Sequence, residues 1–173
     1  VNINMKSLSV KDKSGLRIQQ LRFHFVANKQ RAQLTGFRLQ LPHSLIELAP
    51  ATLTYSFDGK NLQMASLQYD FQILPSRITP SDLAPLLPIL GNFDKPMMLA
   101  TTFNGTSTAL TVGNLSVSTP SNSLILQAKG SLGNIGSKPR WAAQVRRFSV
   151  SDAGMGFIAA NLGHKVRIPA FIT

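Results

Sequence analysis

Cysteine is absent from this chain of 173 residues, and acidic residues are scarce. Without cysteine the chain has no disulfide bond and no thiolate metal site. Its 18 lysines and arginines outnumber 7 acids and give a net charge of +11, which indicates a surface that attracts anions. Tryptophan occurs once and tyrosine twice, and these residues are not interleaved with the basic ones as on a nucleic-acid-binding surface. We therefore expect no nucleic-acid partner.

A long hydrophobic run is also missing. The longest, residues 83–90, is interrupted by Pro85 and Pro88 and is too short to span a membrane. No stretch has the pattern of a signal peptide. Val1 is not an initiator residue, and the last four residues, 170–173, have a strand-like pattern. We therefore expect an internal fragment of a longer protein, with any membrane anchor outside it.

Residues with catalytic chemistry are few and dispersed. His24, His43 and His164 stand alone, and the acids are spread along the chain. No Ser/His/acid phrase, glycine-rich phosphate loop or metal-ligand spacing occurs. The sequence therefore predicts a protein that is not an enzyme, with no catalytic residue, no cofactor and no metal site.

Apolar and polar residues alternate along most of the chain, as in antiparallel strands with one apolar face. The alternation slips at Gln19-Gln20, which predicts a bulge, and Asp58-Gly59 has the signature of a hairpin turn. Pro75 is expected to close the strand that precedes it. The strand patterns cover residues 16–25, 37–41, 53–57, 62–73, 97–103, 109–117, 123–132 and 141–150.

In two places the period lengthens to about 3.6, which predicts a short helix. The first has Leu83, Leu86, Leu87 and Leu90 on one face and ends at Gly91. Its two prolines predict a short, kinked or partly irregular element. The second carries Met155, Phe157, Ile158 and Leu162 and ends at Gly163. Asp82 and Asp152, each preceded by serine, are the expected caps.

The two helices belong to a phrase that occurs twice. Ser81-Asp82 leads to Leu90-Gly91 and Pro96, and Ser151-Asp152 leads to Leu162-Gly163 and Pro169. This repetition predicts one continuous array of β-units, with boundaries at 1–91, 92–163 and 164–173, the last beginning a further unit with a strand at 166–172. The expected fold is mainly β with short helices, in which antiparallel units form a curved, groove-like sheet (a β-taco). A closed β-sandwich is the alternative.

A repeated β-unit of this form, ending in a capped apolar helix, resembles the TamB-like branch of the AsmA family, particularly its Bacteroidetes members. The stretches that carry the resemblance are residues 8–16 (LSVKDKSGL), 113–123 (GNLSVSTPSNS) and 151–158 (SDAGMGFI). The resemblance implies a translocation and assembly module that is anchored in the inner membrane and extends through the periplasm. It also implies phospholipid transport between the two membranes and outer-membrane biogenesis, including protein secretion and assembly with an outer-membrane barrel protein of the assembly-factor class.

On this hypothesis the apolar strand faces line a groove for phospholipid acyl chains, and the helices border or plug it. The candidate groove-lining residues are Phe37, Leu39, Leu41, Leu53, Tyr55, Phe57, Tyr69, Phe71, Leu124 and Leu126. The candidate plug residues are Leu83, Leu86, Leu87, Leu90, Phe157, Ile158 and Leu162. The same alternation suits a closed core, and the same helices suit a cover over one end of a sheet. The alternative function is therefore a structural or adhesion module that binds a protein or a glycan.

Overall fold

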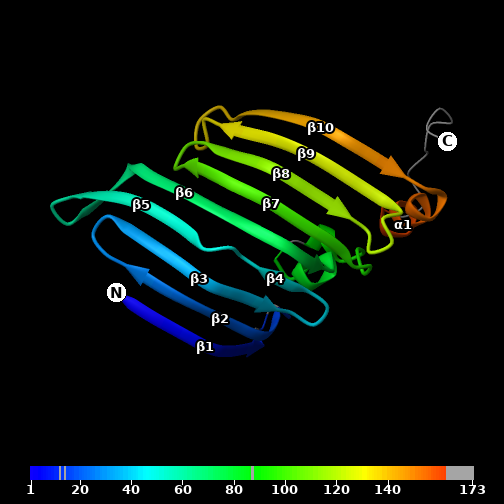
Figure 1. Ribbon diagram of the computed structural model, residues 1–173, viewed down its shortest axis with the longest axis horizontal. Coiled ribbons are helices and arrows are strands. Elements are labelled where there is room, and N and C mark those ends of the chain that lie inside the picture. The colour runs from blue at the N-terminus through cyan, green and yellow to red at the C-terminus, as the bar shows by residue number, and fades with distance from the viewer. Residues whose placement is uncertain (12, 14, 87, 163–173) are drawn as a thin grey trace.

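One curved antiparallel sheet dominates the computed structural model, which describes residues 1–11, 13, 15–86 and 88–162, with the backbone alone for residues 89 and 160–162 (Figure 1). Its ten strands are β1 (Asn2–Lys11), β2 (Arg17–Ala27), β3 (Arg31–Gln40), β4 (Leu45–Glu47), β5 (Ala51–Asp58), β6 (Asn61–Ile78), β7 (Met97–Thr106), β8 (Leu110–Ser118), β9 (Leu124–Gly133) and β10 (Arg140–Val150). Short helical elements follow β6 and β10. They are the 3-10 turns η1 (Pro80–Leu83) and η2 (Pro88–Leu90) and the helix α1 (Asp152–Leu162).

Apart from β4 and β5, strands adjacent in sequence are neighbours in the sheet, from β1 at one edge to β10 at the other. The place between β3 and β6 is shared by two strands, because β4 pairs with one end of β3 and β5 with the other. The long strand β6 then pairs with β7 from Gln68 opposite Thr106 to Ile78 opposite Met97. The sheet therefore continues without interruption between the two units expected from the repeat. The strand expected at 166–172 lies outside the described residues.

Local turn and bulge signals correspond to real features of the sheet. Between Leu21 and Ile18, strand β2 has one more residue than β1, which places the predicted bulge at Gln19-Gln20. Asp58 pairs with Asn61 across a tight turn in which Gly59 has a φ of 59°, as predicted from Asp58-Gly59. The strand end predicted at Pro75 was wrong. Strand β6 continues to Ile78, and the proline lies at a register shift between Ile73 and Ser76, where its missing N–H removes no regular ladder bond.

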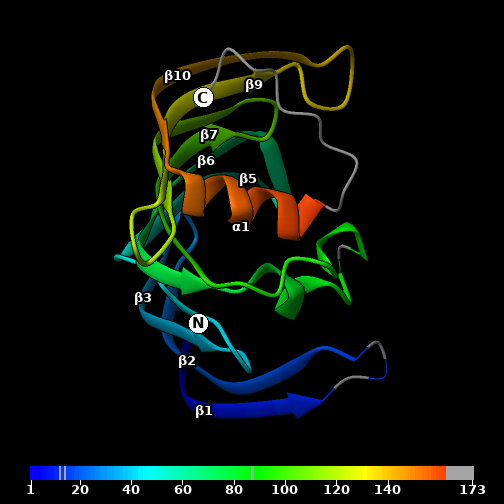
Figure 2. The same ribbon diagram turned by 90° about the vertical axis from the view of Figure 1, so that its right-hand side faces the viewer.

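The sheet curls into an open C in cross-section (Figure 2). We call its concave side the trough. Helix α1 and the helical stretch that contains η1 and η2, termed the 80–90 segment, both lie on this side at the same end of the sheet. All ten described strands belong to one sheet, so the predicted curved sheet is confirmed, and the closed sandwich with a second facing sheet is not the observed fold.

The trough leaves the protein with a thin core. Among the described residues, the buried apolar side chains are Ala32, Leu41, Ile78 and Pro80, and no large side chain falls below 2% exposure. Most apolar strand residues are instead half-buried, because only one side of their sheet is covered by neighbouring side chains. An antiparallel sheet can expose one face to solvent when the side chains of that face are polar, whereas here the exposed concave face is apolar.

The 80–90 segment differs from the helix that the leucine spacing predicts. Pro85 and Pro88 interrupt the i to i−4 pattern, so the chain forms two separate 3-10 turns, which agrees with the expected irregularity. The prediction that Asp82 caps this helix was wrong, since Thr79 occupies the N-cap position without a side-chain hydrogen bond. Asp82 instead lies within η1 and accepts hydrogen bonds from the turn between β3 and β4.

The second helix starts as the sequence suggests, although the cap is Ser151. The Ser151 Oγ accepts a hydrogen bond from the Gly154 N–H at 3.4 Å and donates one to the Ser123 carbonyl at 3.3 Å. Asp152 is the first residue of α1 and places a negative charge in the first turn, where it interacts favourably with the positive end of the helix dipole.

Replacing this cap gives a first testable prediction. Ser151→Ala removes both hydrogen bonds and is expected to lower the free energy of unfolding by about 1 kcal/mol, or the melting temperature by about 2–4 °C for a chain of this length. Ser149→Ala, in the exposed part of β10, is the matched control and should change the melting temperature by less than about 1 °C. Equal effects of both variants in thermal unfolding would contradict the capping role.

Candidate binding trough

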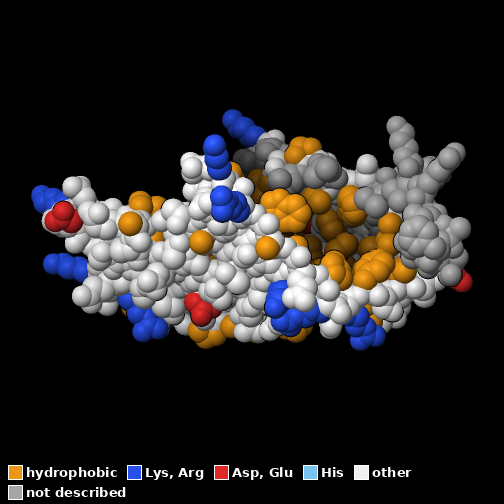
Figure 3. Space-filling model, turned by 90° about the horizontal axis from the view of Figure 1, so that it is seen from above, with side chains coloured by type: hydrophobic (Ala, Val, Ile, Leu, Met, Phe, Trp, Pro, Cys, Tyr) orange, Lys and Arg blue, Asp and Glu red, His pale blue; other side chains and the backbone are white. Residues whose placement is uncertain are grey.

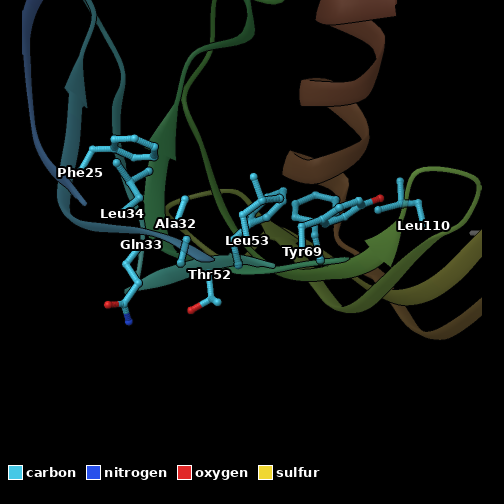
Figure 4. Close-up of a pocket in the computed structure, with 11 residues that line it drawn as sticks. Phe25, Ala32, Gln33, Leu34, Thr52, Leu53, Tyr69 and Leu110 are labelled. Carbon is cyan, nitrogen blue, oxygen red and sulfur yellow. The ribbon is translucent and has the colours of Figure 1, made fainter. Parts of the chain in front are cut away.

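A cavity with a volume of about 590 Å³ lies in the trough. This is within the range of about 300–1,000 Å³ that small-molecule sites occupy. Its walls come from β2, β3, β5, β6, β7 and β8. The close-up shows most labelled side chains rising into the cavity, while Gln33 and Thr52 point to the opposite side of the sheet (Figure 4). The lining residues are Phe25, Ala32, Gln33, Leu34, Ala51, Thr52, Leu53, Tyr69, Phe71, Phe103 and Leu110.

Strand register places these side chains on one face. A single cross-strand row runs from Ala32 through Leu53, Tyr69 and Gly105 to Leu110. Because successive residues of a strand point to opposite faces, the positions two along from this row, such as Phe71, share the concave side. Alternation within each strand and pairing between strands together build the apolar wall.

Glycine at one position of the row makes room for the aromatic side chain next to it. A Cβ at Gly105 would overlap the Ala109 carbonyl oxygen and would lie 2.7 Å from the Tyr69 hydroxyl. The Tyr69 ring therefore lies across the bare backbone of β7, and its hydroxyl donates to the Ala109 carbonyl at 3.2 Å. This bond satisfies the tyrosine hydroxyl at the trough wall.

Aromatic rings form the centre of the wall. The Phe71 and Phe103 rings are 5.0 Å apart, and the Tyr69 and Phe71 rings are 6.0 Å apart, both with tilted planes. These separations lie in the usual range for favourable aromatic pairs. The cluster gives the open trough a rigid apolar patch without a closed core.

Three of the predicted groove-lining residues, Leu53, Tyr69 and Phe71, line this cavity. Leu41 is buried at 2% exposure, and Phe57 is 46% exposed at the hairpin end of β5, next to Tyr55 in an edge-on ring contact. Phe37, Leu39, Leu124 and Leu126 are half-buried strand residues outside the cavity. Leu126 is on the same face as Leu132, the cross-strand partner of the lining residue Leu110.

The predicted plug residues whose side chains the structure describes lie at one end of the trough and do not line the cavity. Leu83 and Leu90 are half-buried, and Leu86 is 62% exposed because the two 3-10 turns do not keep the helical spacing. Phe157 and Ile158 are half-buried on α1. The side chains of Leu87 and Leu162 lie outside the described part of the chain.

Sequence reasoning missed other lining residues, chiefly Phe25, Leu34, Phe103 and Leu110. The alternation already placed Phe25 on an apolar face. The pairing of Leu53 with Tyr69 depends on a register shift between Thr54 and Ser56, which the turn at Asp58-Gly59 does not predict. Phe103 and Leu110 become neighbours of these residues only through the register of β6, β7 and β8, which local pattern does not reveal.

The apolar surface continues beyond the cavity to the edge strand β10. Trp141, Val145 and Phe148 are 78%, 61% and 53% exposed and pair with Leu132, Ala128 and Leu126 of β9. Seen from above, hydrophobic side chains gather in a hollow toward the end that carries α1 (Figure 3). Large contiguous apolar patches on protein surfaces mark sites of interaction with ligands, membranes or other proteins.

One buried acid, Asp82, lies outside the cavity and has a structural role. Asp82, whose side chain is 4% exposed, accepts hydrogen bonds from the His43 N–H at 2.9 Å, the His43 Nδ1 at 3.0 Å and the Ser44 hydroxyl at 2.7 Å. Ser44 thus bonds to the carboxylate and not to the imidazole, so the three residues do not form a nucleophile–base relay. They fasten the 80–90 segment to the turn between β3 and β4.

Within the described ranges, no group of three or more histidine and acidic side chains is placed to hold a metal ion. No described helix has both the length and the apolar character needed to cross a membrane. No protein-family model, curated protein or solved structure matches this chain.

Proposed function

We propose that this chain is a segment of an envelope biogenesis protein whose trough carries the acyl chains of phospholipids. The observation that supports the proposal is the continuous apolar concave face, with a cavity of about 590 Å³ and almost no buried core beneath it. An ordinary domain would cover such a face with a second layer. Among the described residues, the helical elements lie only toward one end, so no described element covers the rest of the face (Figure 1).

An acyl chain is the ligand class that suits this surface. Moving apolar carbon from water into the trough gains about 0.8 kcal/mol per methylene, so a chain of about 16 carbons gains on the order of 10 kcal/mol. The tyrosine hydroxyl of the wall is already bonded to Ala109, so the wall demands no polar group from the ligand. A flexible alkyl chain fits this requirement.

The wider role follows from the family resemblance. The full-length protein is proposed to be anchored in the inner membrane and to extend through the periplasm. Its proposed function is phospholipid transport between the membranes, outer-membrane protein assembly with a barrel partner, or both. This role requires binding and release without a chemical step, so we propose that the protein is not an enzyme and uses no cofactor.

Lipid extraction tests the trough directly. Organic extracts of the purified, folded chain are expected to contain phospholipid or fatty acid by mass spectrometry. Leu53→Glu, which places a charge on the trough wall, should reduce the retained lipid about tenfold, because losing roughly two methylene contacts already removes 1.4 kcal/mol or more.

Thr54→Glu is the matched control. It adds the same charge to the next residue of β5, whose side chain points to the opposite face of the sheet, where Arg31 is its cross-strand partner. This variant should retain lipid like the wild type, with an unchanged circular dichroism spectrum. Lipid-free extracts of the folded wild type, or equal retention by both variants, would rule out the trough as a lipid site.

A further inference from the structure

The convex face carries a second hollow, on the side of the sheet opposite to the trough. It has a volume of about 480 Å³ and lies over β1, β2 and β3. Side chains on this face alternate with trough residues, and those at the hollow are Asn4, Lys6, Arg22, His24 and Thr35, with Gly36 beside them. Every charged side chain among the lining residues is basic.

Two irregularities of the sheet create this hollow. Between Met5 and Leu8, β1 has one residue more than the β2 segment from Phe23 to Leu21, so Lys6 and Ser7 together face Arg22. Strand β3 bulges at Gly36, which has a φ of 62° and no atom within 4 Å of the position a Cβ would take. The bulges therefore open a depression and leave one side of it without a side chain.

The register places a second arginine, Arg38, next to the Arg22 of the hollow. Arg22 is directly opposite Arg38 across the β2–β3 pair, an arrangement that destabilises a sheet when nothing lies between the charges. The nearest compensation is Glu47, whose carboxylate is 3.7 Å from Arg38. In the part of the chain that the structure describes, the side chains of Lys6 and Arg22 have no hydrogen-bond or ion-pair partner, and the Arg38 Nε is buried without one.

We propose that this hollow is a binding site for a phosphate group. Arg22 presents the planar fork that binds phosphate oxygens in pairs, and Lys6 adds three further donors on the neighbouring strand. The Thr35 hydroxyl lies on the third strand, and His24 Nε2 is 2.9 Å from the Asn2 Oδ1, which holds the imidazole at the rim. A bound phosphate offsets the repulsion between Arg22 and Arg38. The site is independent of the trough and does not rest on its proposed function.

Titration with inorganic phosphate at constant ionic strength tests the site, with nuclear magnetic resonance of the backbone amides as the readout. We expect saturable shifts concentrated at Lys6, Thr35 and Gly36. Arg22→Gln and Lys6→Gln should each weaken phosphate binding about tenfold, since each removes a charge-assisted contact. Both side chains are exposed and lack partners, so neither variant should melt below the wild type without phosphate. Arg22→Gln should melt at the same temperature or slightly higher, because it also removes the repulsion with Arg38.

Arg77→Gln is the matched control, since Arg77 is an exposed arginine of β6 outside the hollow, and it should leave the affinity unchanged. Shifts that do not saturate, or equal losses of affinity from Arg77→Gln and Arg22→Gln, would overturn the proposal and indicate non-specific attraction of phosphate by the net positive charge.

Vesicles of phosphatidylcholine with and without phosphatidic acid distinguish the source of the phosphate. Sedimentation with phosphatidic acid that inorganic phosphate reverses identifies a lipid headgroup, and saturable phosphate binding without sedimentation identifies a soluble ligand.

Discussion

Asp82→Ala is expected to destabilise the protein by about 3–4 kcal/mol, because it removes three charge-assisted hydrogen bonds. The His43 N–H loses its acceptor, and the buried Ser44 hydroxyl keeps only the longer bond to the Thr79 carbonyl at 3.3 Å. For a chain of this length the melting temperature should fall by about 6–16 °C. The Ser44 hydroxyl is the central group of the affected cluster. It also accepts a hydrogen bond from the Thr79 N–H at 2.9 Å, so the substitution loosens both the β3–β4 turn and the entry to η1.

Two variants separate this effect from a general loss of negative charge. Asp82→Asn keeps one acceptor oxygen and should lose about half as much stability as Asp82→Ala. Asp94→Ala removes an acid that is 70% exposed and paired only with its neighbour Lys95, and should change the free energy of unfolding by less than about 0.5 kcal/mol. Chemical denaturation measures all three. A loss for Asp82→Ala no larger than that for Asp94→Ala would show that the cluster does not hold the 80–90 segment.

Gly105→Ala is expected to lower the free energy of unfolding by about 2–3 kcal/mol, the usual effect of overfilling a packed site. The added methyl group meets the Ala109 carbonyl and the Tyr69 ring at the same time. The carbonyl belongs to the backbone of the β7–β8 turn, where it also accepts a hydrogen bond from the Thr106 N–H at 2.8 Å, so it cannot turn aside as a flexible side chain does. We expect the ring of Tyr69 to be displaced from the trough wall.

Gly133→Ala provides the comparison within the same sheet. A Cβ at Gly133 would lie 3.9 Å from the Arg140 carbonyl, an ordinary contact, and the residue needs no left-handed backbone. Alanine restricts the unfolded chain more than glycine does, so this variant should be as stable as the wild type or about 0.5 kcal/mol more stable. Similar melting temperatures for the two variants, together with unchanged tyrosine fluorescence in Gly105→Ala, would contradict the close fit of Tyr69 over β7.

The sequence was sufficient to predict the antiparallel strands, because one apolar face and one polar face impose a period of two that few other structures share. The bulge at Gln19-Gln20 and the turn at Asp58-Gly59 were predictable for the same local reason. The extent of β6 was not, since a proline normally ends a strand and Pro75 is tolerated only at a register shift. That shift depends on where β7 pairs, which is a property of the whole sheet.

The candidate site was predictable only in part. Leu53, Tyr69 and Phe71 could be assigned to an apolar face from alternation alone, whereas Phe103 and Leu110 join them through pairings between strands. The leucines of the 80–90 segment matched a helical spacing, yet two prolines prevented that helix, and Leu86 turned toward solvent. The role of Asp82 was also hidden, because its partners lie 38 and 39 residues earlier in the chain.

The two edge strands show how an open sheet of this kind avoids unwanted pairing. Along β1 the charged residues are Lys6 and Lys11, and along β10 they are Arg140, Arg146 and Arg147, so neither described edge carries an acid. When the free edge of one copy approaches that of another, positive charge meets positive charge, and the exposed backbone groups are kept apart. A strand that joins either edge has to bring neutral or acidic side chains to the convex face. Electrostatic repulsion thus disfavours basic segments as additional strands of the sheet. The apolar concave face does not take part in this selection.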